Sequence, residues 1–362
     1  MRLSFIMGSF PRLPIGGYRV VYEYANHLAA RGHQVSIYHC REVKGFPPPQ
    51  GLYRKLRTHL GYCYRKLTHP TPDWQHIDPR VVMRLIPRPE ARYLDDADVV
   101  FATSWAMAAD VIGYPASKGE KVYFYQHYET WSGPKEAVDA TWRMPFHKLV
   151  ISKWLLEIGE SLGADAMTLI PDGIDLDLFR LTRPMENRGP LVTMMYSHQT
   201  WKGGADGLAA LEMVKRQIPA LHAILFGLVK PEVTLPAWVT FHENPPQQAL
   251  VDEIYNRGAI FLWPSHFEGF SLPPAEAMAC GSAVVSTDCG GVLDFAEHNV
   301  SALISPPRQP EQLAANTVEL LRDEPKRLAL AQAGHAGIQA FTWARSGDLM
   351  EEFLNKIKRG ST

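Results

Sequence analysis

The chain has 362 residues, of which 46% are hydrophobic and 21% charged, and its formal net charge is −1 at pH 7. This length exceeds one ordinary domain and predicts two domains of comparable size, each with its own core. The balanced charge argues against a nucleic-acid partner, because proteins that bind polyanions are usually clearly basic. The four cysteines lie far apart without a C-x-x-C pair, so we expect a reducing compartment and neither a zinc site nor a disulfide framework.

The N-terminal segment MRLSFIMGSF has one basic residue and only a short apolar run before Pro11. We therefore expect a buried strand there and not a signal peptide. No uninterrupted apolar stretch approaches the roughly 18–20 residues that a membrane-spanning helix needs. The sequence predicts a cytoplasmic protein that is soluble or bound to the surface of the inner membrane.

Short apolar runs alternate with helical patterns along almost the whole chain. The predicted strands of the first half are residues 3–7, 34–38, 98–102, 121–125 and 167–170. Those of the second half are residues 191–195, 223–226, 259–263 and 283–286. Amphipathic stretches such as residues 18–30 lie between them. Strands that alternate with helices are typical of parallel sheets covered on both faces, so the predicted fold class is α/β.

The strand-first pattern restarts at LVTMMYS, residues 191–197, after a polar, proline-containing stretch. We place the domain boundary there, which gives an N-terminal domain of residues 1–180 and a C-terminal domain of residues 181–342. The last stretch, residues 343–358, predicts a helix with Leu349, Phe353 and Ile357 on one stripe. Two open α/β domains present the carboxyl ends of their strands to a shared crevice, where ligands bind.

Residues 41–70 depart from this pattern. They carry seven lysines and arginines, one acidic residue, Glu42, and interleaved aromatic residues. The segment is predicted to be an insertion between strands. Two interpretations stay open: a surface that faces a membrane or an acceptor, or a solvated basic loop.

The densest chemical signal lies in residues 259–291, AIFLWPSHFEGFSLPPAEAMACGSAVVSTDCGG. A buried strand ends there at Pro264, and Pro273 and Pro274 predict the start of a helix, because proline lacks the N–H that has no partner in a first turn. Glu268 lies in the intervening loop and Glu276 near the helix start, and the prolines keep them out of one continuous helix. The backbone amides of residues 269–272 are expected to be unpaired between the two carboxylates.

Such an arrangement suits a nucleotide sugar. Free amides and the positive end of a helix dipole hold phosphate, while carboxylates accept hydrogen bonds from sugar hydroxyls. Gly269 lets the backbone approach a ligand without a side chain in the way. The alternative is that Glu276 only complements the helix dipole and Glu268 lies on the surface, since an E-x7-E spacing often arises by chance.

The segment resembles the signature of the retaining glycosyltransferase family 4, which reads P-S-x-x-E-G-F-x-L-P-x-x-E-A-M-A-C-G and matches residues 264–281. The resemblance implies a GT-B fold, in which two Rossmann-like domains face each other across a central cleft and the last helix returns to the N-terminal domain. It further implies that Glu268 holds the hydroxyls of the donor sugar and Glu276 the ribose. The implied donor-binding residues beside them are Gly269, Phe270, Ser271 and Leu272.

Other landmarks of the family occur in the expected order. Gly16 and Gly17 open a predicted helix after the first strand and resemble the glycine-rich loop beside the donor diphosphate, although a plain turn remains an alternative. Their spacing is not the G-x-G-x-x-G of a dinucleotide binder. IPDGIDL, residues 170–176, resembles the family's hinge segment, with Asp172 where Asn is usual.

Two site assignments follow from the resemblance alone. The family presents an Arg and a Lys to the diphosphate; Lys202 matches the Lys, but His198 stands near the place of the Arg. Either His198 or an arginine from elsewhere assists, or Lys202 acts with backbone amides. His127 follows a predicted strand and resembles a histidine that contacts the donor sugar, although a lone His is often an ordinary residue. Glu129 is a weaker candidate for contact with the acceptor.

The implied function is retaining transfer from a nucleoside-diphosphate sugar to a glycan, lipid-linked or small-molecule acceptor, in surface polysaccharide or glycoconjugate biosynthesis. Lys202, Glu268 and His127 are the implied catalytic residues. We expect no metal ion and no other cofactor, since the D-x-D pattern in residues 95–98 precedes a strand at the end opposite the cleft. The alternatives are a catalytically degenerate GT-B partner subunit, and an epimerase or phosphorylase on the same fold.

Overall fold

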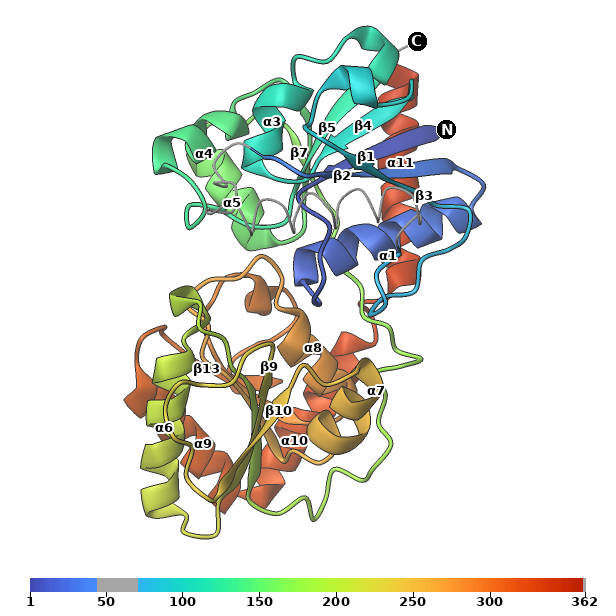
Figure 1. Ribbon diagram of the computed structural model, residues 1–362. Coiled ribbons are helices and arrows are strands. Elements are labelled where there is room, and N and C mark those ends of the chain that lie inside the picture. The colour runs from blue at the N-terminus through green and yellow to red at the C-terminus, as the bar shows by residue number, and fades with distance from the viewer. Residues whose placement is uncertain (44–70, 361–362) are drawn as a thin grey trace, which may run out of the picture. The chain divides into compact units, whose positions relative to one another are not determined.

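The computed structural model describes residues 1–43 and 71–360 and divides into two compact units (Figure 1). The first unit comprises Met1–Asp172 together with the C-terminal segment from Trp343, and the second comprises Gly173–Thr342. The basic insertion proposed for residues 41–70 lies almost entirely outside the described residues. No helix in the described ranges is long and apolar enough to cross a membrane.

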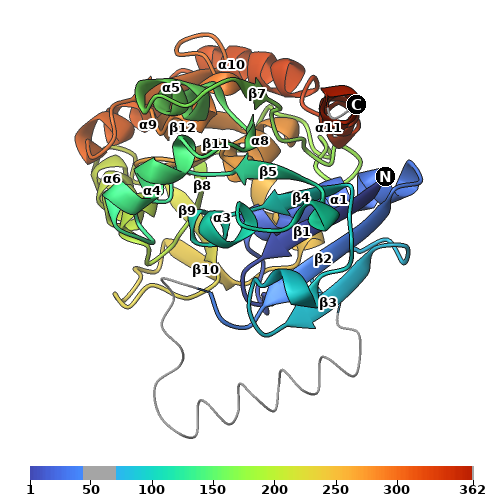
Figure 2. The same cartoon turned by 90° about the horizontal axis from the view of Figure 1, so that it is seen from above.

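The first unit is a parallel sheet with strand order β3-β2-β1-β4-β5-β6-β7, part of which can be followed in Figure 2. Its strands are β1 (Arg2–Met7), β2 (Gln34–Cys40), β3 (Val82–Ile86), β4 (Val99–Ala102), β5 (Glu120–Tyr125), β6 (His147–Val150) and β7 (Met167–Leu169). Its helices are α1 (Gly16–Ala30), α3 (Trp105–Val111), α4 (Lys135–Trp142), α5 (Lys153–Ser161) and α11 (Trp343–Gly360), with short 3-10 turns η1 (Ala91–Tyr93) and η2 (Ala116–Lys118).

The second unit repeats this design with the order β10-β9-β8-β11-β12-β13, again all parallel. Its strands are β8 (Leu191–Met195), β9 (His222–Gly227), β10 (Val239–Glu243), β11 (Ile260–Trp263), β12 (Ala283–Thr287) and β13 (Ala302–Ser305). Its helices are α6 (Gly204–Gln217), α7 (Gln247–Ala249), α8 (Leu272–Ala279), α9 (Pro310–Arg322) and α10 (Glu324–Ile338), with the π-helix η4 (Leu250–Tyr255) and the 3-10 turns η3 (Thr200–Lys202) and η5 (Gly291–Asp294).

The C-terminal helix α11 packs on α1 of the first unit, as the resemblance implied. Its buried stripe includes the predicted Phe353 and Ile357, but Met350 is buried where Leu349 was expected, and Leu349 is only half-buried. His33 on the α1 side lies 2.6 Å from Glu351 of α11. Helix α11 is therefore held on the first unit by its apolar stripe and by the polar contact between His33 and Glu351.

Strand order reverses once in each sheet, between β1 and β4 in the first unit and between β8 and β11 in the second. Ligands of open α/β sheets bind beyond the carboxyl ends of the strands at such switch points. The predicted α/β class and the arrangement in two Rossmann-like units are confirmed. Lys202 follows β8 and Glu268 follows β11, so both candidate residues leave the sheet at the switch point of the second unit.

Candidate functional site

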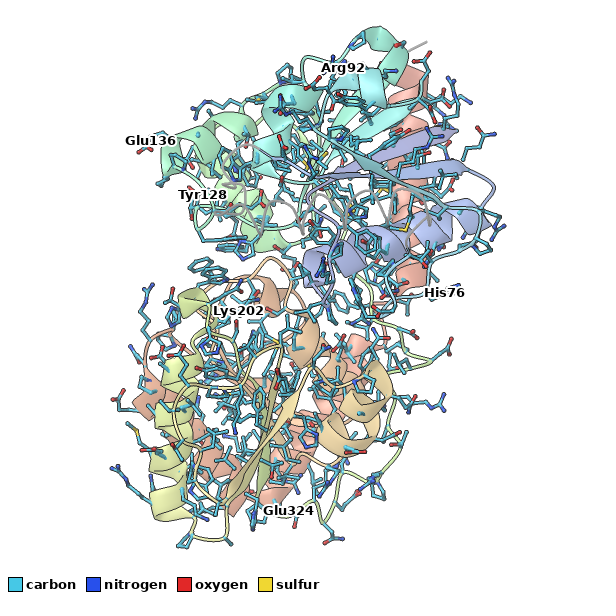
Figure 3. The ribbon with its side chains drawn as sticks, viewed as in Figure 1. His76, Arg92, Tyr128, Glu136, Lys202 and Glu324 are labelled. Atoms are coloured by element: carbon cyan, nitrogen blue, oxygen red, sulfur yellow. The ribbon has the colours of Figure 1, made fainter. Side chains whose placement is uncertain are left out.

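Lys202 and Glu268 form an ion pair at the switch point of the second sheet. Lys202, labelled in Figure 3, is the last residue of η3 and lies just before α6. The ammonium nitrogen Nζ of Lys202 lies 2.8 Å from both Oε1 and Oε2 of Glu268. The hydroxyl of Ser265 donates a second hydrogen bond of 2.6 Å to Oε1. The Glu268 side chain is 7% exposed and that of Lys202 22%. The carboxylate is thus largely desolvated and held by two donors, while the ammonium keeps access to solvent.

The loop that carries Glu268 is locked by its backbone. The amide of Glu268 donates to the carbonyl of Cys289 at 2.7 Å, and the amide of Gly291 donates to the carbonyl of Glu268 at 3.2 Å. A Cβ atom on Gly291 would lie 2.2 Å from the carbonyl oxygen of Gly269, so only glycine permits this approach. The carboxylate is therefore positioned before any ligand arrives.

The glycine that follows Lys202 has an equally specific role. Gly203 has a φ of 63°, in the left-handed region, and caps the N-terminus of α6. A Cβ atom there would lie 1.9 Å from the carbonyl oxygen of Pro264. The chain leaving β8 thus packs directly against the end of β11, which brings Lys202 to Glu268. The K-G pair of the sequence is explained by this contact.

The loop after Glu268 presents amides at a helix N-terminus. Ser271 has a φ of 82° and precedes α8, whose first turn contains Pro273 and Pro274 as predicted. None of the backbone N–H groups of residues 269–272 donates a hydrogen bond to another residue of ranges 1–43 and 71–360. These amides and the positive end of the helix dipole form a cradle for an anion.

Glu276 is the second carboxylate of this region. It lies in α8, one residue beyond the first turn, and is 3% exposed. The hydroxyl of Tyr255, at the end of η4, donates to its Oε2 at 3.0 Å. Tyr255 and Ser265 were not singled out from the sequence. Ser265 could have been, because it belongs to the P-S pair of the matched motif.

The second unit uses a half-buried arginine, Arg188, and a buried one, Arg327, for structure. Arg188 donates to the carbonyl oxygens of Tyr255, Gly258 and Cys280 at 3.0–3.3 Å, and burial lowers the pKa of Arg188 to about 10. Arg327 donates to the carbonyl oxygen of Met185 at 3.1 Å. Both guanidinium groups hold backbone segments together.

His198, which stands near the expected arginine, lies at the exposed start of the segment that leads to Lys202. Its Nε2 is 3.0 Å from the carbonyl oxygen of Lys230, and its ring meets that of Tyr196 edge to face, with 5.3 Å between the centroids. The ring is thus held against Lys230 and Tyr196. Lys202 and the amides of residues 269–272 are therefore the positive groups that this edge offers to an anion.

The remaining candidates belong to the first unit. Gly16 and Gly17 are the first residues of α1, and their helix start has no side-chain cap. A Cβ atom on Gly17 would lie 3.2 Å from Oε1 of Gln126, whereas one on Gly16 would meet open space. Gly17 therefore allows the start of α1 to approach the residue that follows β5, and both glycines leave the helix N-terminus bare.

His127 follows β5 and lies among aromatic rings. It meets Trp131 and Trp154 edge to face, at centroid distances of 6.3 and 6.1 Å. Glu129 has a structural role: its Oε2 accepts the amide N–H of Trp105 at 2.7 Å and so caps α3. Burial raises the pKa of Glu129 to about 7, opposed by the hydrogen bonds from Trp105 and Tyr123.

The D-x-D pattern in residues 95–98 is used for ion pairing. Each carboxylate lies within 3 Å of a cationic side chain: Asp95 of Arg84, Asp96 of Lys118 and Asp98 of Arg2. Within the described part of the chain, no three His, Cys, Asp or Glu residues gather as a metal site would require.

Two family models match the chain: Glycosyltransferase Family 4 over residues 15–178 and Glycosyl transferases group 1 over residues 184–336. A D-inositol 3-phosphate glycosyltransferase of Thermobispora bispora is 26% identical over 260 residues, which are 63% of this chain and 60% of that protein. The chain thus spans less than two thirds of the length of this curated relative.

Solved structures share the fold. Sucrose-phosphate synthase from Thermosynechococcus elongatus superimposes with a TM-score of 0.75 and 17% identity, covering 99% of this chain and 100% of that one. HepE of Anabaena, in complex with UDP-glucose, gives 0.72 and 16%, covering 98% and 99%. The two family matches extend over both units, and the chain belongs to glycosyltransferase family 4, with the GT-B fold.

Proposed function

We propose that this protein transfers a glycosyl group from a nucleoside-diphosphate sugar to a hydroxyl of a glycan, lipid-linked or small-molecule acceptor, with retention of the anomeric configuration and without a metal ion. One observation carries the proposal: the Lys202–Glu268 pair lies at the same sheet edge as the free amides of residues 269–272. A cation, an amide cradle and a fixed carboxylate are the groups that a sugar diphosphate needs.

Each group has a distinct part in the proposed reaction. Lys202 and the amides of residues 269–272 stabilise the charge that develops on the departing diphosphate. Glu268 accepts hydrogen bonds from the hydroxyls of the donor sugar, and Glu276 from the ribose. Gly17 and its neighbour Gly16 open a second helix N-terminus toward phosphate, and His127 contacts the sugar.

The acceptor hydroxyl attacks on the face from which the diphosphate leaves, and the diphosphate takes the proton of that hydroxyl. This route gives retention without a strong general base on the protein, whose contribution is positioning and electrostatic stabilisation. Because Lys202 and the amides already supply positive charge at the phosphate, the proposed reaction proceeds in the presence of a chelator.

Surface polysaccharide or glycoconjugate assembly is the proposed setting, with a glycan or lipid-linked acceptor. The basic residues of segment 41–70 are proposed to contact an anionic membrane surface, where such an acceptor lies. Co-sedimentation with anionic vesicles tests this contact. Binding that is unchanged after those cations are replaced by serine would rule it out.

Calorimetric titration with UDP, GDP, ADP and dTDP tests the donor site, on the wild type, on Glu276→Ala and on the control Glu212→Ala, an exposed glutamate of α6. UDP is titrated first because the structure of HepE is a complex with UDP-glucose. We expect one diphosphate to bind and Glu276→Ala alone to weaken it. If none of the four binds, the degenerate partner subunit becomes the better hypothesis.

The reaction itself is tested with the sugar nucleotide of the preferred base. The reaction is run in the presence of EDTA, so that product formation tests whether transfer needs a metal ion. Proton NMR of the product then reports its anomeric configuration. An inverted product, or activity that requires an added divalent ion, would contradict the proposal. Release of free nucleotide at full rate without acceptor would favour an epimerase.

A further inference from the structure

A buried histidine of the first unit lies between the end of β1 and the start of α1. His39 belongs to β2, and its side chain is 1% exposed. Its neighbours come from elements that are adjacent in this unit, since β1 pairs with β2 and α1 packs on β2. No step of the proposed reaction uses this side chain.

Both ring nitrogens of His39 have hydrogen-bond partners. Nδ1 lies 3.2 Å from the carbonyl oxygen of Gly8, the residue after β1, and Nε2 lies 3.1 Å from the hydroxyl of Tyr22 in α1. A carbonyl oxygen only accepts, so Nδ1 carries the proton and the Tyr22 hydroxyl donates to Nε2. Burial lowers the pKa of His39 to about 4 and raises the pKa of Tyr22, so at pH 7 the ring is neutral and the hydroxyl keeps its proton.

The ring of His39 also supports Tyr18, which belongs to the first turn of α1. The two rings stack with an interplanar angle of 2° and 5.9 Å between their centroids. The Tyr18 hydroxyl donates to the carbonyl oxygen of Ser9 at 2.9 Å. A Cβ atom on Gly8 would lie 2.6 Å from that hydroxyl, so glycine leaves the room that this arrangement needs. Side chains therefore hold the carbonyls of both residues that follow β1.

Tyr18 adjoins two glycines whose amides are available to a ligand. The N–H groups of Gly16 and Gly17 donate to no backbone carbonyl in ranges 1–43 and 71–360, and both residues keep contact with solvent. These amides face phosphate in the proposed function, on which this inference rests. A hydrogen bond to a phosphate oxygen depends on the direction of the N–H group, so the support of Tyr18 bears on how well the amides bind.

We infer that His39 is a positioning residue for the phosphate-binding end of α1. Its Nδ1–H group anchors the chain where it leaves β1, and its ring supports Tyr18 where the chain enters α1. Both ends of the loop between β1 and α1 are thereby tied to one side chain of β2. His39 is too deeply buried to touch the ligand, so its effect reaches the phosphate through Gly8 and Tyr18.

Two amide side chains separate the contacts of His39. In His39→Asn the amide nitrogen lies near the place of Nδ1 and can still donate to Gly8. In His39→Gln the amide reaches the place of Nε2 and serves only Tyr22. Both substitutions remove the ring, so a difference between them reports the contact with Gly8. Tyr22→Phe is the control, because it removes the partner of Nε2 and leaves Nδ1 in place.

Calorimetry measures the effect, with whichever of UDP, GDP, ADP and dTDP the wild type prefers. We expect His39→Gln to weaken binding about fivefold, as for one poorly aligned hydrogen bond. His39→Asn should keep most of the affinity, and Tyr22→Phe should bind as the wild type does. Urea denaturation of the same samples identifies a purely structural role, in which the variants lose stability but the folded proteins all bind equally well.

The wild-type protein itself reports the tautomer, so this result does not depend on the folding of a variant. In protein labelled with ¹⁵N on histidine, the His39 ring is assigned by its nuclear Overhauser contacts with the ring of Tyr18. We expect Nδ1 to carry the proton and Nε2 to carry none between about pH 6 and 8.

Three results would overturn the inference: a proton on Nε2 alone, equal affinities of His39→Gln and His39→Asn, or a weakening in Tyr22→Phe as large as that in His39→Gln. If the wild type binds a diphosphate and His39→Gln binds it equally well, only this inference fails, because the donor site is still present. If the wild type binds none of the four, the proposed function fails and the role of His39 in phosphate binding fails with it.

Discussion

Lys202 Nζ lies equidistant from the two carboxylate oxygens of Glu268, at 2.8 Å from each, and Glu268 Oε1 also accepts the hydroxyl of Ser265. The cation proposed for phosphate and the anion proposed for sugar hydroxyls therefore neutralise each other when no ligand is bound. The pair keeps a carboxylate largely buried without an uncompensated charge. It also fixes the orientation of both side chains.

Removal of one partner of this pair should be much more harmful than removal of both. Lys202→Met leaves the buried Glu268 carboxylate without a cation and with only the Ser265 hydroxyl as partner, and we expect a loss of about 2–3 kcal/mol in the free energy of unfolding. Lys202→Met combined with Glu268→Gln should recover most of it. Lys326→Met, which breaks the exposed pair with Glu319, should change stability by about 0.5 kcal/mol or less. Urea denaturation measures all three; equal losses in single and double variants would contradict the argument.

Gly203 should tolerate no side chain. Gly203→Ala places a Cβ atom 1.9 Å from the carbonyl oxygen of Pro264, in addition to the strain of a positive φ. We expect a loss of about 3 kcal/mol or more. Gly189 has nearly the same φ, 64°, but nothing within 4 Å of its Cβ position, so Gly189→Ala should lose only about 1 kcal/mol. Similar thermal stabilities of the two variants would show that the backbone contact is unimportant.

Tyr255 should affect nucleotide binding through Glu276. Tyr255→Phe removes the 3.0 Å hydrogen bond to Oε2 and leaves the carboxylate less firmly oriented. We expect nucleoside diphosphate affinity to fall about fivefold, as for the loss of one hydrogen bond. Tyr125→Phe is the control, because it also removes a buried hydrogen bond, to the carbonyl of Thr141, but in the first unit. Calorimetry should find its affinity unchanged; a weakening as large as that in Tyr255→Phe would remove the assignment.

The sequence predicts the strands with strong apolar runs and misses four others. β3, β6, β10 and β13 are only four or five residues long, and three of them include charged residues. Lys148 of β6 shows the physical reason: its side chain is fully buried and paired with Asp165, which no local pattern reveals. Short strands that are completed by their neighbours lack a periodic signal of their own.

The candidate site is predictable to a similar extent. The E-x7-E spacing and the prolines locate Glu268, Glu276 and the amide cradle, because these lie within one short segment. The ion pair between Lys202 and Glu268 spans 66 residues and depends on the close approach at Gly203, so spacing alone does not disclose it. The capping role of Glu129 depends on a contact with Trp105 from another strand's loop and is equally hidden.

Two titratable groups of the first unit give opposite pH dependences. Burial lowers the pKa of His39 to about 4, opposed by a hydrogen bond to the carbonyl of Gly8, so the unfolded chain binds the proton first as pH falls from 6.5. Its contribution to stability is lost between about pH 6.5 and 4. The pKa of Glu129 is raised to about 7, so its contribution is present below pH 4.5 and is lost as pH rises to 7.

Glu129→Gln should therefore expose the effect of His39. The glutamine amide keeps an oxygen for the Trp105 N–H and does not titrate. Between pH 5 and 6.5 the free energy of unfolding of the variant should therefore rise with pH more steeply than that of the wild type. The difference in slope should be up to about 1.4 kcal/mol per pH unit. Hydrogen exchange of the β1 and β2 peptides reports the first unit alone. Parallel pH profiles for variant and wild type would mean that Glu129 ionises normally.

Asp172 occupies a position at which a neutral side chain should be better. The residue is 1% exposed, and its Oδ1 has no hydrogen-bond partner in the described ranges. Burial raises the pKa of Asp172 well above its usual range, so the folded state keeps the proton while the unfolded chain releases it above about pH 3.8. The folded state therefore loses stability relative to the unfolded chain as pH rises through that range.

Asp172→Asn keeps the shape of the side chain and removes this dependence, so the variant should gain stability over wild type as pH increases. We expect a difference near zero at pH 4 that grows into a gain as the pH rises to 8, measured by urea denaturation and by exchange of the first-unit peptides. Asp73→Asn, at an exposed position of the same unit, should show no such trend. If Asp172→Asn is already more stable than wild type by the full amount at pH 4, the gain reflects better packing or hydrogen bonding. If the variant is less stable than wild type at pH 8, the carboxylate is ionised and stabilised in the folded protein.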